Sequence, residues 1–208
     1  SFVVVTGGGY HVYWLLKESA GQEDIPQVEA ILRGLARALK ADMNKDVFLG
    51  VEANEKNVKS INLTDRKVIA FATHGLSPGD LNGLEQPALA LSAPDVAGID
   101  GDGLLTMEEI LALKLNADWV VLSACNTGSG DGAGGEAVSG LGRAFFYAGA
   151  RSLLVSNWPV ETGSAKLLTT EVFKRSAENP ALTRAQALRQ TMLWLMDSFM
   201  RVRPAAIL

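Results

Sequence analysis

The sequence predicts an α/β fold with a mostly parallel central sheet that helices cover on both faces. Short segments that are apolar throughout alternate with longer segments of helical periodicity, and strands buried on both faces are typical of parallel sheets. The 208 residues, of which 48% are hydrophobic and 20% charged, suit one domain with a substantial core. We therefore expect residues 1–208 to form a single domain. Because the chain enters a strand directly after Ser1, we also expect it to be a piece of a longer protein.

Apolar runs bounded by turn-forming residues mark the strands. We predict strands at 2–6, 46–50, 67–72, 118–124 and 151–156, with 87–92 as a further candidate. Apolar residues at helical spacing predict helices at 27–40, 54–61, 136–149, 162–177 and 183–199. One more helix is expected to begin at Thr106, because Glu109 three residues later has the spacing of a capping box.

Composition and charge narrow the range of partners. The net charge of −4 and the absence of a Lys/Arg cluster interleaved with aromatic residues argue against direct binding of nucleic acid. The longest apolar runs, such as 119–122 and 152–155, are far shorter than the roughly 20 residues of a membrane span. No segment has the pattern of a signal peptide, and one cysteine cannot form an internal disulfide. We expect a cytoplasmic protein that binds neither nucleic acid nor a membrane.

Two residues with chemical potential follow predicted strands. His74, one of two histidines, comes shortly after the strand at 67–72 and precedes Gly75. Cys125, the only cysteine, comes directly after the strand at 118–124 and precedes Asn126. A single cysteine about 50 residues after a histidine has the order and spacing of the caspases, although the local signature around this cysteine differs. The pair therefore predicts a cysteine endopeptidase.

The chemistry of such a pair depends on activation of the thiol. A free thiol has a pKa of about 8.5, so an imidazole that removes its proton generates the nucleophilic thiolate. The carboxyl ends of parallel strands meet at one edge of a sheet, which would bring His74 and Cys125 together. Gly75 has no Cβ, and we expect the backbone N–H groups of Gly75 and Cys125 to form an oxyanion hole. Taken alone, the cysteine would be read as inert core and the histidine as a polar strand end.

The motifs around both residues resemble those of one particular protein family. They are residues 68–75, 102–110, 115–128, 135–152 and 156–161. Over about 28–199 the chain resembles CHAT domains, a caspase-like peptidase family often joined to tetratricopeptide repeats and related to separase. The resemblance implies a caspase-like three-layer sandwich with His74 as general base and Cys125 as nucleophile. It also implies a thioester acyl-enzyme, no metal and no cofactor, a protein or peptide substrate, and control by a repeat domain or by other segments of the parent chain.

Substrate selection is expected beside the strand that follows the nucleophile. The polar residues available there are Ser156, Asn157 and Glu161, and Trp158 is placed to form the wall of a neighbouring pocket. A Glu161 carboxylate would favour Arg or Lys before the scissile bond, through charge and bidentate geometry. Two alternatives stay open, because Glu161 can instead cap the following helix and Trp158 can belong to the core.

Other interpretations of the chain are weaker or of another class. A catalytically silent caspase-like module that serves as a binding or signalling platform would fit the same sequence with a misaligned pair. A flavodoxin-like or Rossmann-type binder fits the strand and helix order, but the glycines at 7–9 do not complete a phosphate-binding motif. Residues 98–109 imitate part of an EF-hand loop, yet Gly98 stands where a carboxylate is needed, so we expect a turn followed by a helix cap.

Overall fold

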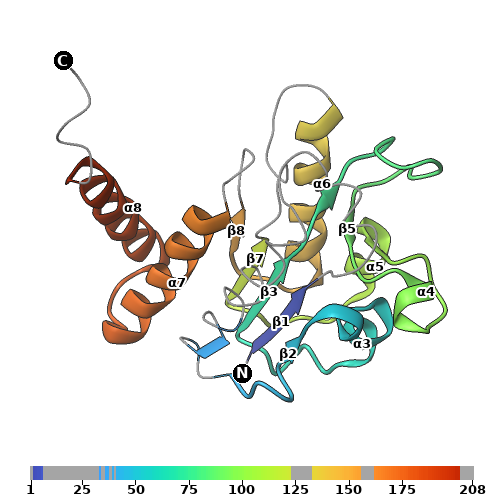
Figure 1. The fold of residues 1–208 in the computed structure, drawn as a ribbon, viewed down its shortest axis with the longest axis horizontal. Helices are drawn as coiled ribbons and strands as arrows, with labels where there is room; N and C mark the ends of the chain where they lie inside the picture. The colour runs from blue at the N-terminus through green and yellow to red at the C-terminus, as the bar shows by residue number, and fades with distance from the viewer. Residues whose placement is uncertain are drawn as a thin grey trace.

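A five-stranded parallel sheet forms the centre of the molecule (Figure 1). The structure, a computed structural model, describes residues 2–6, 33, 36–37, 39, 41–122, 133–155 and 162–201. The strand order is β2-β1-β3-β7-β8. The strands are β1 (Phe2–Thr6), β2 (Val47–Phe48), β3 (Val68–Ala72), β7 (Trp119–Leu122) and β8 (Leu153–Val155). All four neighbouring pairs are parallel, so the predicted parallel sheet is confirmed.

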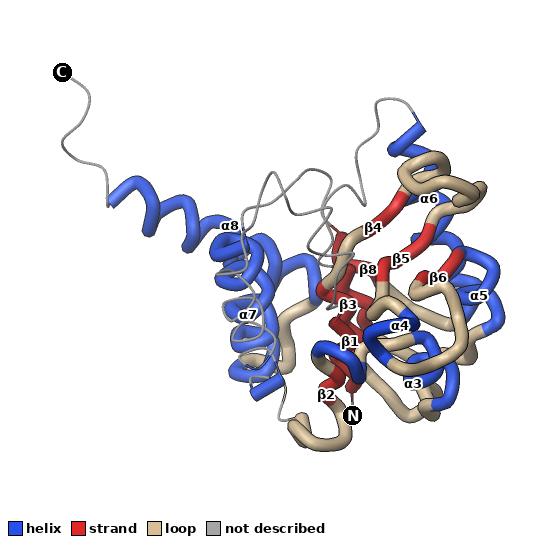
Figure 2. The backbone as a smooth tube through the Cα atoms, turned by 45° about the vertical axis from the view of Figure 1, so that its right-hand side comes forward, coloured by secondary structure: helices blue, strands red, loops and turns tan. Residues whose placement is uncertain are grey.

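Helices lie on both sides of this sheet and complete three layers (Figure 2). One side carries α3 (Glu55–Ser60), α4 (Pro94–Ala97), α5 (Met107–Ala112) and α6 (Ala133–Ala148). The other side carries α7 (Thr162–Glu178) and α8 (Arg184–Arg201). The α/β three-layer class expected from the sequence is therefore confirmed. That residues 1–208 form a single domain stays a prediction.

Alternating residues of the central strands supply two separate cores. In β3, Phe71 packs in one buried cluster, where its ring centroid lies 5.6 Å from that of Phe145 on α6. In β7, Trp119 packs in the cluster on the other face, with its ring centroid 5.3 Å from that of Phe173 on α7. Successive side chains of a strand point to opposite faces, so a strand covered on both faces has to be apolar at every position. This explains the continuous apolar runs in the sequence.

A second, antiparallel sheet packs beside the first one. It contains β4 (Gly75–Leu76), β5 (Ala88–Ala90) and β6 (Leu104–Thr106), in the order β4-β5-β6. Only its middle strand was anticipated, as the candidate at 87–92. Strands of two or three residues are too short to show a period of two, and the surrounding Gly and Pro residues predict loops. The chain passes from the central sheet into this one across Thr73 and His74.

Local hydrogen bonds at two helix starts agree with the sequence. Asn54 caps α3 by accepting a hydrogen bond from the backbone N–H of Asn57 at 2.9 Å. At α5 the predicted capping box is present, since the Thr106 hydroxyl accepts from the Glu109 N–H and the Glu109 carboxylate accepts from the Thr106 N–H at 2.8 Å. The turn-and-cap interpretation of 98–109 is confirmed, because the carboxylate at its end is engaged in the cap.

A glycine at the end of α6 allows the helix to meet the segment before β7. Gly149 has a φ of +116°, and a Cβ at this position would lie 2.2 Å from the carbonyl oxygen of Leu115. The Leu115 N–H donates to the carbonyl of Ala148 at 2.7 Å, which ties the two segments together. A side chain at Gly149 would break this approach.

Several element boundaries differ from the prediction. The strand expected at 46–50 has two residues, because the chain turns into a 3-10 helix at Gly50–Glu52. Helix α6 begins at Ala133, three residues before its predicted start. Of the helix predicted at 27–40, the described residues with helical backbone are Arg33, Ala36 and Arg37, and most of the segment lies outside the described residues. Within the described parts of the chain, no helix has the length and apolar character needed to cross a membrane.

Candidate active site

The strands that precede His74 and Cys125 are neighbours in the central sheet. β3 pairs with β7 in parallel register, with Phe71 opposite Leu122. His74 and Cys125 each follow their paired residue by three positions. Neighbouring strands are about 4.8 Å apart, so β3, which precedes His74, and β7, which precedes Cys125, end side by side at the same edge of the sheet. Cys125 itself lies outside the described residues, and the last described residue before it is Leu122.

The backbone of His74 is held between the two sheets by hydrogen bonds to Ala90. The Ala90 N–H donates to the His74 carbonyl at 2.9 Å. The buried hydroxyl of Thr73 donates to the Ala90 carbonyl. Two successive residues of the chain are thereby joined to one residue of β5, at the point where the chain leaves the central sheet. This clamp fixes where the His74 side chain begins.

The His74 imidazole is largely removed from water. Burial lowers its pKa from the ordinary value of 6.5, because the charged imidazolium is desolvated. No described residue makes a hydrogen bond to the imidazole. The neutral form is therefore favoured at neutral pH, and only this form can accept a proton from a thiol.

The backbone direction at Gly75 follows from the same clamp. Residues in an antiparallel pair alternate between positions that exchange hydrogen bonds and positions that do not. His74 opposite Ala90 is a hydrogen-bonded position, so the next pair, Gly75 opposite Leu89, is a non-bonded one. The Gly75 N–H is therefore directed away from β5, on the outer side of β4. An N–H directed out of its sheet is what the role in an oxyanion hole requires.

A comparison with protein-family models gives one match of almost the full chain. The model of the CHAT domain matches residues 15–204. The chain belongs to the CHAT domain family. This is a caspase-like family related to peptidases, in agreement with the resemblance expected from the motifs. No curated protein matches this CHAT domain.

The remaining predicted site residues of this CHAT domain lie outside the described residues. These are Cys125, Ser156, Asn157, Trp158 and Glu161. The strand before the last four is described, and Val155 of β8 pairs with Leu122 of β7. β7 and β8 therefore end level with each other, and β3 ends one residue further along, at Ala72. A predicted site segment follows each of the three strands. Helix α7 begins at Thr162, directly after Glu161, so a capping role for Glu161 stays open beside the role in specificity.

Sequence reasoning missed the clamp on His74. Thr73 stands between an apolar strand and a histidine, and nothing in that pattern identifies Ala90 as its partner. The signal that exists is the polar residue itself, because a buried threonine hydroxyl requires an acceptor. In the parts of the chain that the structure describes, no group of three His, Cys, Asp or Glu residues is arranged to hold a metal ion.

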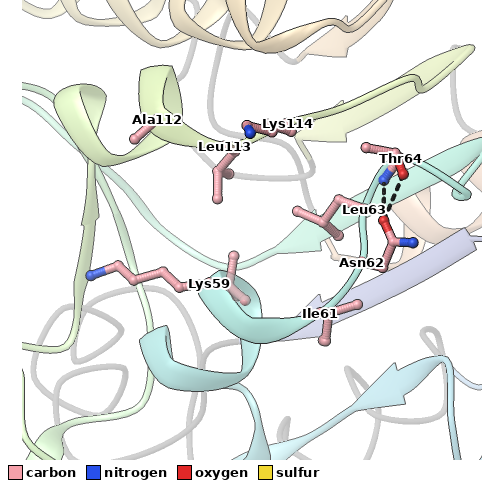
Figure 3. A pocket seen from close by; sticks show the side chains of 9 residues that line it. Lys59, Ile61, Asn62, Leu63, Thr64, Ala112, Leu113 and Lys114 are labelled. Atoms are coloured by element: carbon pink, nitrogen blue, oxygen red, sulfur yellow. Dashed lines mark hydrogen bonds between the residues drawn. The ribbon is translucent and has the colours of Figure 1, made fainter.

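A pocket elsewhere in the domain is not part of this site. It has a volume of about 280 Å³ and lies between the end of α3, residues 61–64 and residues 112–114 (Figure 3). The segments 61–64 and 112–114 precede β3 and β7, so the pocket lies toward the amino ends of these strands, away from His74. Three of its polar side chains are paired, since Lys59 binds Glu55 at 2.8 Å and Asn62 accepts from the Thr64 hydroxyl at 2.6 Å.

The clamp predicts a loss of stability in Thr73→Val. This substitution keeps the shape of the side chain but leaves the buried Ala90 carbonyl without its hydroxyl donor. We expect the free energy of unfolding to fall by about 1–2 kcal/mol. Thr73→Ser retains the hydroxyl and serves as the control, with a smaller loss. Urea denaturation measures all three proteins, and a Thr73→Val protein as stable as the wild type would contradict the clamp.

The burial of His74 predicts a pH dependence of stability. Its pKa lies below 6.5 in the folded protein and near 6.5 in the unfolded chain, so the unfolded chain binds the proton more readily. Relative to His74→Gln, the wild type should lose stability as the pH falls below 6.5, and the loss should be complete once the pH is below the folded-state pKa. Urea denaturation at pH 7.5 and 5.5 measures this difference.

Nuclear magnetic resonance titration of the imidazole tests the pKa directly. The His11→Gln variant removes the signal of the second histidine, so the remaining signal belongs to His74. An imidazole that titrates at or above pH 6.5 in the folded protein would contradict the desolvation of His74.

Proposed function

We propose that this CHAT domain is a cysteine endopeptidase in which Cys125 is the nucleophile and His74 the general base. The observation that carries the proposal is the register of β3 and β7. Phe71 of β3 pairs with Leu122 of β7, and His74 and Cys125 each come three positions later in the chain than their paired residue. The family supports a peptidase-related role, and the lowered pKa of His74 supports a neutral imidazole that can accept a proton.

The proposed reaction has two chemical steps. His74 takes the thiol proton, and the Cys125 thiolate attacks the carbonyl carbon of the scissile peptide bond. The oxyanion that forms is stabilised by the N–H groups of Gly75 and Cys125. The C–N bond then breaks, the leaving amine takes the proton from His74, and a thioester remains. In the second step His74 takes a proton from water and the hydroxide attacks the thioester carbonyl. The C–S bond then breaks, the carboxylic acid is released, and the Cys125 thiolate takes the proton back from His74.

The substrate in this proposal is a specific protein or peptide with a basic residue before the scissile bond. Glu161 would bind that residue, with Ser156, Asn157 and Trp158 lining the adjoining surface. A thiol nucleophile fits a reducing compartment, so we place the enzyme in the cytoplasm. An exposed thiolate peptidase there would need control by a regulatory repeat domain or by segments of the parent chain.

Cleavage of a fluorogenic peptide library tests the catalytic pair. We expect wild-type cleavage to be lost in Cys125→Ala and to fall by about 10²–10⁴-fold in His74→Ala. His11→Ala, which replaces the other histidine, is the matched control and should keep wild-type activity. A mechanism-based thiol probe is applied in parallel. Absence of cleavage together with labelling of Cys125 no faster than a free thiol would contradict the proposal and favour a catalytically silent binding module.

The same library tests the specificity pocket. With Glu161 in the pocket, the wild type should prefer Arg or Lys before the cut, and Glu161→Gln should lower kcat/KM for these peptides by about 10-fold or more. Activity toward peptides with a neutral residue at this position is the control. If the preference survives in Glu161→Gln while the free energy of unfolding falls, Glu161 caps α7 instead.

A further inference from the structure

The second half of α8 presents apolar side chains to solvent. The exposed fractions of Met192, Leu193 and Met196 are 49%, 45% and 59%. Figure 2 shows this part of the helix leading away from α7 and from the sheet. Residues at i, i+1 and i+4 of a helix share one side, so the three side chains form a continuous apolar face. We call Met192, Leu193 and Met196 the α8 face.

A different side of α8 makes the contacts within the domain. Ala187 and Thr191 are fully buried, and Thr191 satisfies its hydroxyl by donating to the Ala187 carbonyl at 2.9 Å. The guanidinium of Arg175 on α7 lies over the ring of Trp194, 5.8 Å from the ring centroid, and 39% of Trp194 stays exposed. None of these three contacts involves the α8 face.

Charges of opposite sign flank the α8 face at equal distances. Arg189, Leu193 and Asp197 follow one another at intervals of four residues and form one ridge along the helix. Both charged side chains are exposed, and eight residues separate them by about 12 Å along the axis, too far for an ion pair with each other. Among the described residues neither has an ion-pair partner. The neighbouring Arg175 and Arg184 do have partners, Glu171 at 3.0 Å and Asp118 at 3.6 Å.

We propose that the α8 face binds the α8 face of a second copy of this chain. In an antiparallel pair with a twofold axis at Leu193, Arg189 lies opposite Asp197 of the partner subunit, and Asp197 opposite Arg189 of the partner subunit. The apolar residues meet at the centre, between two identical ion pairs. A parallel pair would place like charges opposite one another, which is unfavourable.

The pattern favours a second copy over an unrelated partner. A surface with an apolar centre and one charge of each sign at equal distances on either side is complementary to itself under twofold rotation. The contact involves one helix face on each chain, so it belongs to the smallest class of specific interfaces. The dimer is therefore weak and depends on protein concentration, with dissociation in the micromolar to millimolar range.

Sedimentation velocity over a concentration series tests the proposal. The 208-residue chain is used with Cys125→Ala as common background, which prevents self-cleavage and separates this test from the proposed function. We expect the background protein to dimerise as its concentration rises. Arg189→Glu and Asp197→Arg should each weaken dimerisation by about 10-fold or more, because each puts two like-charged pairs across the axis. The double variant Arg189→Glu/Asp197→Arg again places opposite charges across the axis, so its dimerisation affinity should return to within about 3-fold of the background value.

Two further variants complete the experiment. Leu193→Asp should abolish dimerisation, because it places two carboxylates at the axis. Arg143→Glu, which reverses an exposed charge on α6, is the matched control and should leave dimerisation unchanged. Circular dichroism verifies that each variant is folded. The proposal would be overturned if the background protein stays monomeric at the highest concentration, or if the double variant dimerises no more tightly than the single variants. The α8 face would then bind a partner of other composition.

Discussion

The parallel pairing of β3 with β7 is the constraint on which both the core and the candidate site depend. Each strand contributes alternate side chains to two separate hydrophobic clusters, so a shift of one residue would exchange the clusters on both faces. The same register sets the level at which the chain leaves the sheet before His74 and before Cys125. The packing that stabilises the fold therefore also aligns the approach to the proposed catalytic pair.

The position of His74 depends on a junction between two sheets. Parallel strands end at a common edge, but an edge alone does not orient a side chain. Here the chain continues from β3 into β4, and the bonds of Thr73 and His74 to Ala90 secure this change of direction. β5 in turn is held by packing of Leu89 in the cluster that contains Phe71. The backbone position of His74 is thus supported by the core in which Leu89 packs.

The sequence predicts the parts of this arrangement that leave a periodic or capping signal. β3 and β7 are recognisable because strands buried on both faces are apolar throughout, and α5 because Thr106 and Glu109 have capping-box spacing. β4 and β6 are not recognisable, since pairing with β5 and not intrinsic preference forms them. For the candidate site, the place of His74 and Gly75 after a strand marks them as candidates in the sequence. The clamp joins Thr73 to Ala90, which lies 17 positions later in the chain, and the acceptor is a backbone carbonyl. Because every residue type carries this carbonyl, no sequence pattern could identify Ala90 as the partner.

The α8 face and the antiparallel sheet beside His74 lie on different sides of the central sheet (Figure 2). Helix α8 reaches the sheet through Ala187, which packs in the cluster of Trp119 and Val121. The antiparallel sheet that clamps His74 packs in the other cluster, through Leu89 and Leu105. Pairing of two chains through α8 would therefore leave β4 and the edge beside His74 accessible to a peptide. Because the two surfaces share no residue, loss of dimerisation and loss of cleavage are separable effects, and a variant that removed both would indicate coupling through the central sheet.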